Sequence, residues 1–301
     1  MGSTAEDQRY GGVLVMGGAD GGKYPDGNSF VFEGSESRLL VDPSMTVHGR
    51  GGAPVPVDGV LLSHVHEDHV PGLTHYPTLP VWVHRDDHPA MVSIDGLMDA
   101  YGYEGELRAH WQEEVLRDFH YVGRPDATAF EDGMRWDLGG GRTVTAIFLP
   151  GHTAGHCGFL VEPDGFFAIG DIDLTGFGPY YGDASSTLEG FRRSIARCRE
   201  VDARWFGTFH HKGVIEGRAT FLALLDDFEA VIDRREVAML EHLAEPRTLD
   251  DLVRHRFVYR PGVDLSFVDM VERRTAELHL AAFVASGQVV EVEPGRFCVA
   301  A

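Results

Sequence analysis

Five short apolar runs in this chain each lead directly into a histidine or an aspartate. The runs have the length and composition of β-strands, and Gly, Pro and Asp separate them. Groups that follow the carboxyl ends of strands gather at one edge of an open α/β sheet, so five segments far apart in the sequence can meet there. The residues reached in this way are Asp42, His64, His152, Asp171 and the adjacent pair His210 and His211.

The order of strand-like and helical patterns predicts two domains. Short β-type runs extend to about residue 215, and the pattern turns helical between Pro89 and Arg124, which indicates a mixed α/β domain. From about residue 220 three helical segments follow, and the last one ends at Gly287 before two strands joined by a Pro-Gly turn. Helix, helix, helix, hairpin is the order of a winged helix. We therefore predict an α/β domain over residues 1–235 and a winged-helix-like domain over residues 236–301.

The charge of the chain argues against nucleic acid and anionic membranes as partners. The 301 residues carry 47 acidic and 26 basic side chains, a formal net charge of -21. Such a surface repels phosphate backbones and anionic head groups. The C-terminal segment has eleven acidic residues against seven arginines, so we expect it to form part of a pocket or a contact between subunits. Scattered cysteines and the absence of a signal-like start indicate a cytoplasmic protein.

The most ligand-rich stretch of the sequence is "VLLSHVHEDHV", which places His64, His66, Asp68 and His69 in the pattern H-x-H-x-D-H. Imidazole nitrogens and carboxylate oxygens suit Zn, Fe or Mn, and two histidines two positions apart converge on an irregular loop where on a strand they would diverge. A solvated turn that is merely rich in histidine remains the alternative for this stretch alone.

Taken together, "LLVDP", "SHVHEDH", "LPGHTAGH", "AIGDIDL" and "FHHKGVI" in this order resemble the metallo-β-lactamase superfamily. The resemblance spans about residues 12 to 216 and implies an αββα sandwich with a two-metal site. The predicted tail resembles that of one hydrolase branch of the superfamily. By the same resemblance, the first metal would be held by His64, His66 and His152. The second would be held by Asp68, His69 and His211, the last preferred over His210, with Asp171 bridging both and Asp42 orienting the loop.

This resemblance implies a binuclear metal-dependent hydrolase. Two divalent cations, zinc first and iron or manganese as alternatives, would lower the pKa of a shared water, and the resulting hydroxide would attack a carbonyl. Asp68 and Asp171 would act as catalytic residues that orient the water. We expect an ester or thioester of a small molecule or acyl carrier as the substrate. Two alternatives stay open: a phosphodiesterase or endoribonuclease with the same metals, and an inactive binding module.

A Gly-rich loop after Asp171 is the predicted source of a substrate pocket. It carries Phe177, Tyr180 and Tyr181, and aromatic residues around a few polar groups are typical of small-molecule sites. Lys212 stands next to the predicted ligands and could attract an anionic group of the substrate, although a surface lysine is the simpler interpretation. His156 could line the site or have a hydrogen-bonded structural role, and we leave it out of the expected ligand set.

Overall fold

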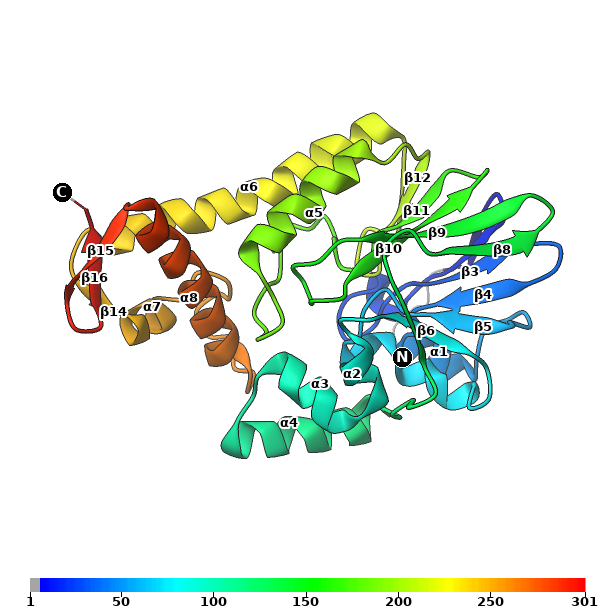
Figure 1. Cartoon of the computed structure of the whole chain (residues 1–301), viewed down its shortest axis with the longest axis horizontal. Coiled ribbons are helices and arrows are strands. Elements are labelled where there is room, and N and C mark those ends of the chain that lie inside the picture. Colours follow the sequence, from blue (N-terminus) through cyan, green and yellow to red (C-terminus); the bar gives the residue numbers. More distant parts are fainter. Residues whose placement is uncertain (1–5, 301) are drawn as a thin grey trace.

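Two mixed β-sheets lie face to face in the computed structural model, which describes residues 6–300 (Figure 1). The first sheet has seven strands in chain order, antiparallel up to β4 and parallel after it: β1 (Gln8–Tyr10), β2 (Val13–Met16), β3 (Ser29–Glu33), β4 (Arg38–Val41), β5 (Gly59–Leu61), β6 (Val81–His84) and β7 (Thr128–Phe130). The second has the order β13-β12-β11-β10-β9-β8: β8 (Arg135–Gly139), β9 (Arg142–Phe148), β10 (Cys157–Glu162), β11 (Phe166–Ala168), β12 (Trp205–Gly207) and β13 (Val214–Glu216).

The inner strands of the first sheet, such as β2 and β5, are continuously apolar because both of their faces are buried. In β2, Val13 and Val15 face the space between the sheets, whereas Leu14 and Met16 face the helices outside. Successive side chains of a strand point to opposite faces, so each strand serves two cores. The core between the sheets is rich in aromatic rings, as in the T-shaped pair of Phe30 and Phe166.

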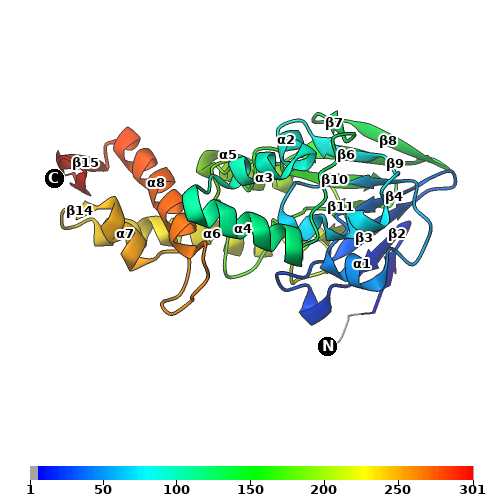
Figure 2. The same cartoon turned by 90° about the horizontal axis from the view of Figure 1, so that it is seen from below.

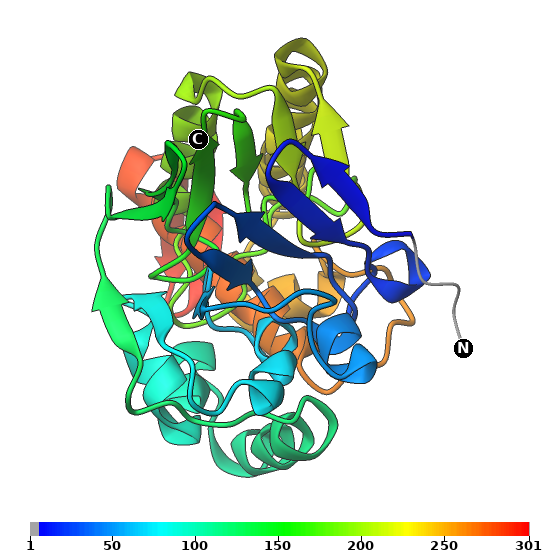
Figure 3. The same cartoon turned by 90° about the vertical axis from the view of Figure 1, so that its right-hand side faces the viewer.

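Helices cover both outer faces and complete four layers (Figure 3). The first sheet is covered by α1 (Met45–Arg50), α2 (His88–Val92), α3 (Ile94–Tyr101) and α4 (Gly105–Asp118). The second is covered by α5 (Leu188–Glu200) and by the first half of α6 (Arg218–His242). Phe221, Leu225, Phe228 and Ile232 recur at helical spacing along α6, and Phe221 stacks on Phe206 of β12 with ring centroids 3.8 Å apart.

The helix α6 joins the sandwich to the C-terminal part of the chain. It runs unbroken from Arg218 to His242, so the boundary we predicted at residues 235 and 236 falls inside a single helix. Its residues up to Ile232 pack on the second sheet, whereas Met239 packs in a separate C-terminal core. One continuous helix therefore connects the two cores, and it is visible along the top of Figure 1.

The C-terminal part consists of small helices and a three-stranded sheet. It contains β14 (Arg247–Thr248), α7 (Leu249–His255), α8 (Val268–Ser286), β15 (Val289–Glu293) and β16 (Arg296–Val299), with the sheet order β14-β16-β15. Thr248 caps α7 through a reciprocal capping box with Asp251, and Gly287 ends α8 in the left-handed conformation. Across residues 6–300, every helix is too short or too polar to cross a membrane.

Candidate metal centre

The loops that follow five strands meet at one edge of the sandwich. Asp42 follows β4, His64 lies beyond β5, His152 follows β9, Asp171 follows β11 and His210 lies beyond β12. This is the convergence that the strand ends predict. A short 3-10 helix over Glu67–His69 completes the cluster.

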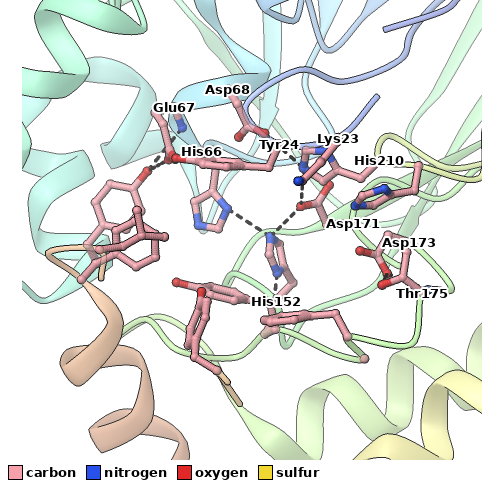
Figure 4. A pocket seen from close by; sticks show the side chains of 18 of the residues that line it. Lys23, Tyr24, His66, Glu67, Asp68, His152, Asp171, Asp173, Thr175 and His210 are labelled. Atoms are coloured by element: carbon pink, nitrogen blue, oxygen red, sulfur yellow. Dashed lines mark hydrogen bonds and ion pairs between the residues drawn. The ribbon is translucent and has the colours of Figure 1, made fainter. Parts of the chain in front are cut away.

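The first group of side chains contains His64, His66, His152 and Asp171, whose ligand-type atoms all lie within 4.8 Å of one another. The inner nitrogen atoms of the three imidazoles face one another. His152 Nε2 lies 3.2 Å from His64 Nε2 and 3.0 Å from His66 Nδ1, and the last two atoms are 3.1 Å apart. Figure 4 shows His66, His152 and Asp171 pointing toward a common centre.

The second group contains Asp68, His69 and His210. His210 Nε2 lies 3.1 Å from Asp68 Oδ2, and His69 Nε2 lies 3.9 Å from Asp68 Oδ1. Asp171 stands between the two groups, because its Oδ1 is 3.1 Å from His69 Nε2 while its Oδ2 is 3.3 Å from His152 Nε2. One carboxylate therefore faces both groups.

The arrangement of these side chains is explained better by bound divalent cations than by hydrogen bonds among the side chains themselves. Three inner ring nitrogens cannot all donate hydrogen bonds to each other, whereas nitrogens bound tetrahedrally to zinc at about 2.1 Å would lie about 3.4 Å apart. His69 Nε2 and Asp171 Oδ1 are buried, yet neither makes a hydrogen bond of acceptable geometry within residues 6–300. Unsatisfied buried polar atoms are costly, and a cation at each group would satisfy them.

The outer nitrogen of each histidine faces an oxygen atom of the protein. His152 Nδ1 lies 3.0 Å from the Tyr180 carbonyl, and His66 Nε2 lies 2.9 Å from Asp183 Oδ2. His69 Nδ1 lies 3.3 Å from Asp42 Oδ2, and the other oxygen of Asp42 accepts the Ser63 amide. The hydrogen bonds of His152 and His66 favour the tautomer that leaves the inner nitrogen free to bind a cation, whereas His69 Nδ1 and Asp42 Oδ2 are close without forming a hydrogen bond. Asp42 thus lies between the Ser63 amide and the His69 ring, and its role in orienting the loop stays a prediction.

The structure brings His210, rather than His211, into the second group. His210 Nδ1 lies 3.0 Å from the carbonyl oxygens of Gly22 and Asp26, which aims its Nε2 at Asp68. His211 has a φ of 58° and an exposed side chain, because the chain turns away from the centre directly after His210. The geometry therefore differs from our preference for His211. The remaining six predicted ligands all lie in the two groups.

A cavity of about 550 Å³ opens beside the two groups. Phe177 and Tyr180 line it as expected, but Tyr181 is buried outside it and its hydroxyl pairs with His279 Nε2 at 2.9 Å. The other walls carry aromatic residues that the sequence did not single out: Tyr24, Tyr101, Tyr103, Trp111, Tyr259 and Phe267. Of the two roles considered for His156, the structure favours the structural one, because its Nε2 accepts the Asp171 amide at 3.0 Å.

Burial and neighbouring charges shift the pKa values of acidic groups in the cavity. Burial raises the pKa of the Asp173 carboxyl to about 6. Burial and the charge of Asp68 raise the pKa of Glu67, which accepts hydrogen bonds from the hydroxyls of Tyr24 and Tyr101. The cavity therefore combines an aromatic surface with a few buried acidic groups.

One of the two lysines of the chain lines this cavity, and the other follows a lining residue in the sequence. Lys23 lines it and Lys212 follows His211, and neither ammonium group has a salt-bridge partner among residues 6–300. Partial burial lowers the pKa of His211, and the positive charges of His210, Lys23 and Lys212 lower it further. Lys23 thus brings a positive charge to a cavity that acidic residues also line.

Sequence comparison agrees with this geometry. The profile of the Metallo-beta-lactamase superfamily matches residues 24–232. An atrochrysone carboxyl ACP thioesterase from Aspergillus fumigatus is 25% identical over 255 residues, which are 79% of this chain and 68% of that protein. A lactamase-like protein, nscB, from Arthroderma otae is 27% identical over 180 residues, 53% of this chain and 46% of that protein, so this chain matches less than half of its length.

Solved structures share the fold. A metallo-beta-lactamase family protein from Thermus thermophilus matches with a TM-score of 0.70 and 21% identity, covering 96% of this chain and 99% of that one. A beta-lactamase domain protein from Burkholderia ambifaria matches with a TM-score of 0.68 and 18% identity, covering 100% and 95%. Both likenesses extend over the C-terminal part as well as the sandwich. With the matched profile and the two buried His/Asp groups, they lead to one conclusion: the chain belongs to the metallo-beta-lactamase superfamily.

Proposed function

We propose that this protein is a binuclear metal-dependent hydrolase that cleaves a thioester or ester carbonyl of a small molecule or acyl carrier. The observation that carries the proposal is the position of Asp171, which faces both His/Asp groups at the floor of an aromatic cavity. Under this proposal the ligands are His64, His66 and His152 on one side and Asp68, His69 and His210 on the other, with Asp171 shared.

The chain's own residues hold and orient the reactants. When bound, two divalent ions would supply Lewis-acid chemistry, lowering the pKa of a water molecule and polarising the substrate carbonyl. Asp68 and Asp171 line the cavity, where their carboxylates can accept hydrogen bonds from the attacking water. The aromatic walls exclude bulk water from the acyl group, which strengthens the electrostatic interactions inside the site. Zinc suits this nitrogen and oxygen set, and iron and manganese are the alternatives.

Two findings support a thioester as the bond that is cleaved. The relative from Aspergillus fumigatus is named as a thioesterase that acts on an ACP, although the identity of 25% leaves the substrate of this chain as a proposal. Lys23, which lines the cavity, and Lys212, which follows the lining residue His211, suit a substrate that carries an anionic group. The net charge of -21 argues against RNA, which is the substrate of our alternative hypothesis.

The C-terminal part supports the winged-helix interpretation through its topology. The end of α6, the short strand β14, the helices α7 and α8 and the hairpin β15–β16 follow in that order, and β14 pairs antiparallel with β16. We propose that this unit serves the pocket or a subunit contact rather than a DNA groove, because acidic residues outnumber arginines in it.

A substrate panel tests the proposed function. Metal-loaded protein would be assayed with an acyl thioester, a lactone and a short RNA, alongside Asp171→Asn and the control Asp118→Asn, which alters an exposed carboxylate at the end of α4. We expect thioester or ester cleavage that Asp171→Asn abolishes and the control retains. Cleavage of RNA with no turnover of the thioester or lactone would overturn the proposal.

A further inference from the structure

A loop of the C-terminal part forms one wall of the cavity. Residues 256–267 connect α7 to α8, and Tyr259, Leu265 and Phe267 from this loop line the cavity. In Figure 2 the loop and the start of α8 lie next to α4, which belongs to the sandwich. The ring centroids of Phe267 and Trp111 of α4 are 5.4 Å apart, so the wall contacts the opposite part of the molecule directly.

A buried carboxylate fixes the start of this loop. Glu272 of α8 is 1% exposed and accepts backbone N–H groups of Phe257, Val258 and Tyr259 at 2.8, 3.0 and 2.7 Å. No cation forms a salt bridge with Glu272 in the described part of the chain. Since a buried charge is stable only when its hydrogen bonds are satisfied, the three amides and the carboxylate hold each other in one geometry.

The ring of Tyr259 is held from two sides. Its centroid lies 5.5 Å from that of Phe177 in the loop after Asp171 and 6.3 Å from that of Phe267. Arg235 of α6 is buried and donates to the carbonyls of Phe177 and Pro179, which fixes the facing loop. Aromatic side chains from three separate segments therefore enclose the cavity in fixed orientations.

We propose that residues 256–267, held by Glu272, form the acyl-selecting wall of the cavity and that the cavity takes a planar aromatic acyl group. The inference rests on the proposed function and specifies its substrate class. A cavity of about 550 Å³ has room for more than a short aliphatic chain. Edge-to-face and offset ring contacts favour an aromatic guest beyond the area that it buries. Glu272 is a positioning residue, whereas Tyr259 and Phe267 contact the acyl group.

Two thioesters of the same thiol, one 2-naphthoyl and one acetyl, test the selectivity. We expect the wild-type kcat/KM to favour naphthoyl by about tenfold or more. Phe267→Ala and Tyr259→Ala should lower kcat/KM more for the naphthoyl thioester than for the acetyl one, and so remove most of this preference. Val284→Ala, an exposed position on α8, is the control and should keep the preference. Equal losses for both thioesters in the two wall variants, or a wild-type preference for acetyl, would overturn the proposal.

The role of Glu272 needs a readout other than turnover. Glu272→Gln keeps the shape of the side chain but removes the charge that holds three amides. Hydrogen exchange should become faster at residues 257–259, and KM for the naphthoyl thioester should rise while kcat changes little. Glu272→Ala should show a larger change in the same direction if it folds. Unchanged exchange and unchanged KM in Glu272→Gln would refute the positioning role.

Binding of the product separates this inference from the proposed function. If the wild-type protein hydrolyses neither thioester, the proposed function fails. The wall is still tested by titrating 2-naphthoate and following the fluorescence of Trp111, with Trp111→Phe to assign the signal. Weaker binding in Phe267→Ala would support the aromatic wall, and unchanged binding would overturn it.

Discussion

Asp183 offers a sharp test of the metal centre, because it touches a predicted ligand without being one. Its buried carboxylate lies 2.9 Å from His66 Nε2 and accepts the Tyr180 hydroxyl at 3.2 Å. The contact with His66 places the ring proton on Nε2 and leaves the Nδ1 lone pair facing His64 and His152. In Asp183→Asn the amide can present N–H to the same nitrogen, which would favour the other tautomer and block Nδ1.

The expected loss follows from the energetics of such outer partners. Removing one typically lowers metal affinity 10- to 100-fold, which corresponds to about 1.4 to 2.7 kcal/mol. Competition with a chromophoric chelator would measure the affinities, and we expect the loss to be confined to one of the two ions.

Two controls make the result interpretable. Tyr180→Phe removes the second contact of Asp183 but keeps His66 in place, so its effect should be smaller. Asp164→Asn changes a carboxylate that binds Arg142 and the Gly12 amide at the opposite end of β11 from Asp171. It should lower stability without changing metal affinity. If Asp183→Asn binds both ions within about twofold of the wild type, the tautomer argument is wrong.

Three further predictions concern the second group, the two lysines and the apo protein. His210→Ala should lose one metal ion by elemental analysis, whereas His211→Ala should retain both; the opposite pattern would restore our original preference. The double variant Lys23→Gln, Lys212→Gln should have a KM several-fold higher than the wild type for a substrate with an anionic group, but an unchanged KM for a neutral one. Salt at about 0.5 M should raise the KM of the wild type in the same way. Removing the metal with a chelator should lower the melting temperature, since ions at about 1,000 times their Kd contribute about 4 kcal/mol; an unchanged melting temperature would contradict a structural contribution from the ions.

The candidate ligands at the strand ends could be predicted because each of them follows its strand directly in the sequence. Each apolar run is read directly from its composition, and the residue after it needs only the rule that strand ends share an edge. The short edge strands β1 and β7 escaped prediction because few of their side chains are buried. For β7 the pairing partner, β6, is also far away in the sequence.

The choice between His210 and His211 depends on contacts that the sequence does not display. The deciding carbonyls belong to Gly22 and Asp26, which lie 188 and 184 residues before His210. Asp183 and Glu272 were missed for the same reason, since each acts on a partner from another element. From the sequence alone, a glutamate within a helical pattern, such as Glu272, is expected to be exposed. Only the structure shows that the amides of residues 257–259 bind it.

The count of metal ions bound per chain tests the central claim most directly. Native mass spectrometry of protein purified without chelator would measure it, with Asp171→Ala as the comparison. Our account predicts two ions per wild-type chain and the loss of both in Asp171→Ala, because one carboxylate faces both groups. A wild-type chain with only trace metal, or an Asp171→Ala chain that keeps two ions, would contradict it.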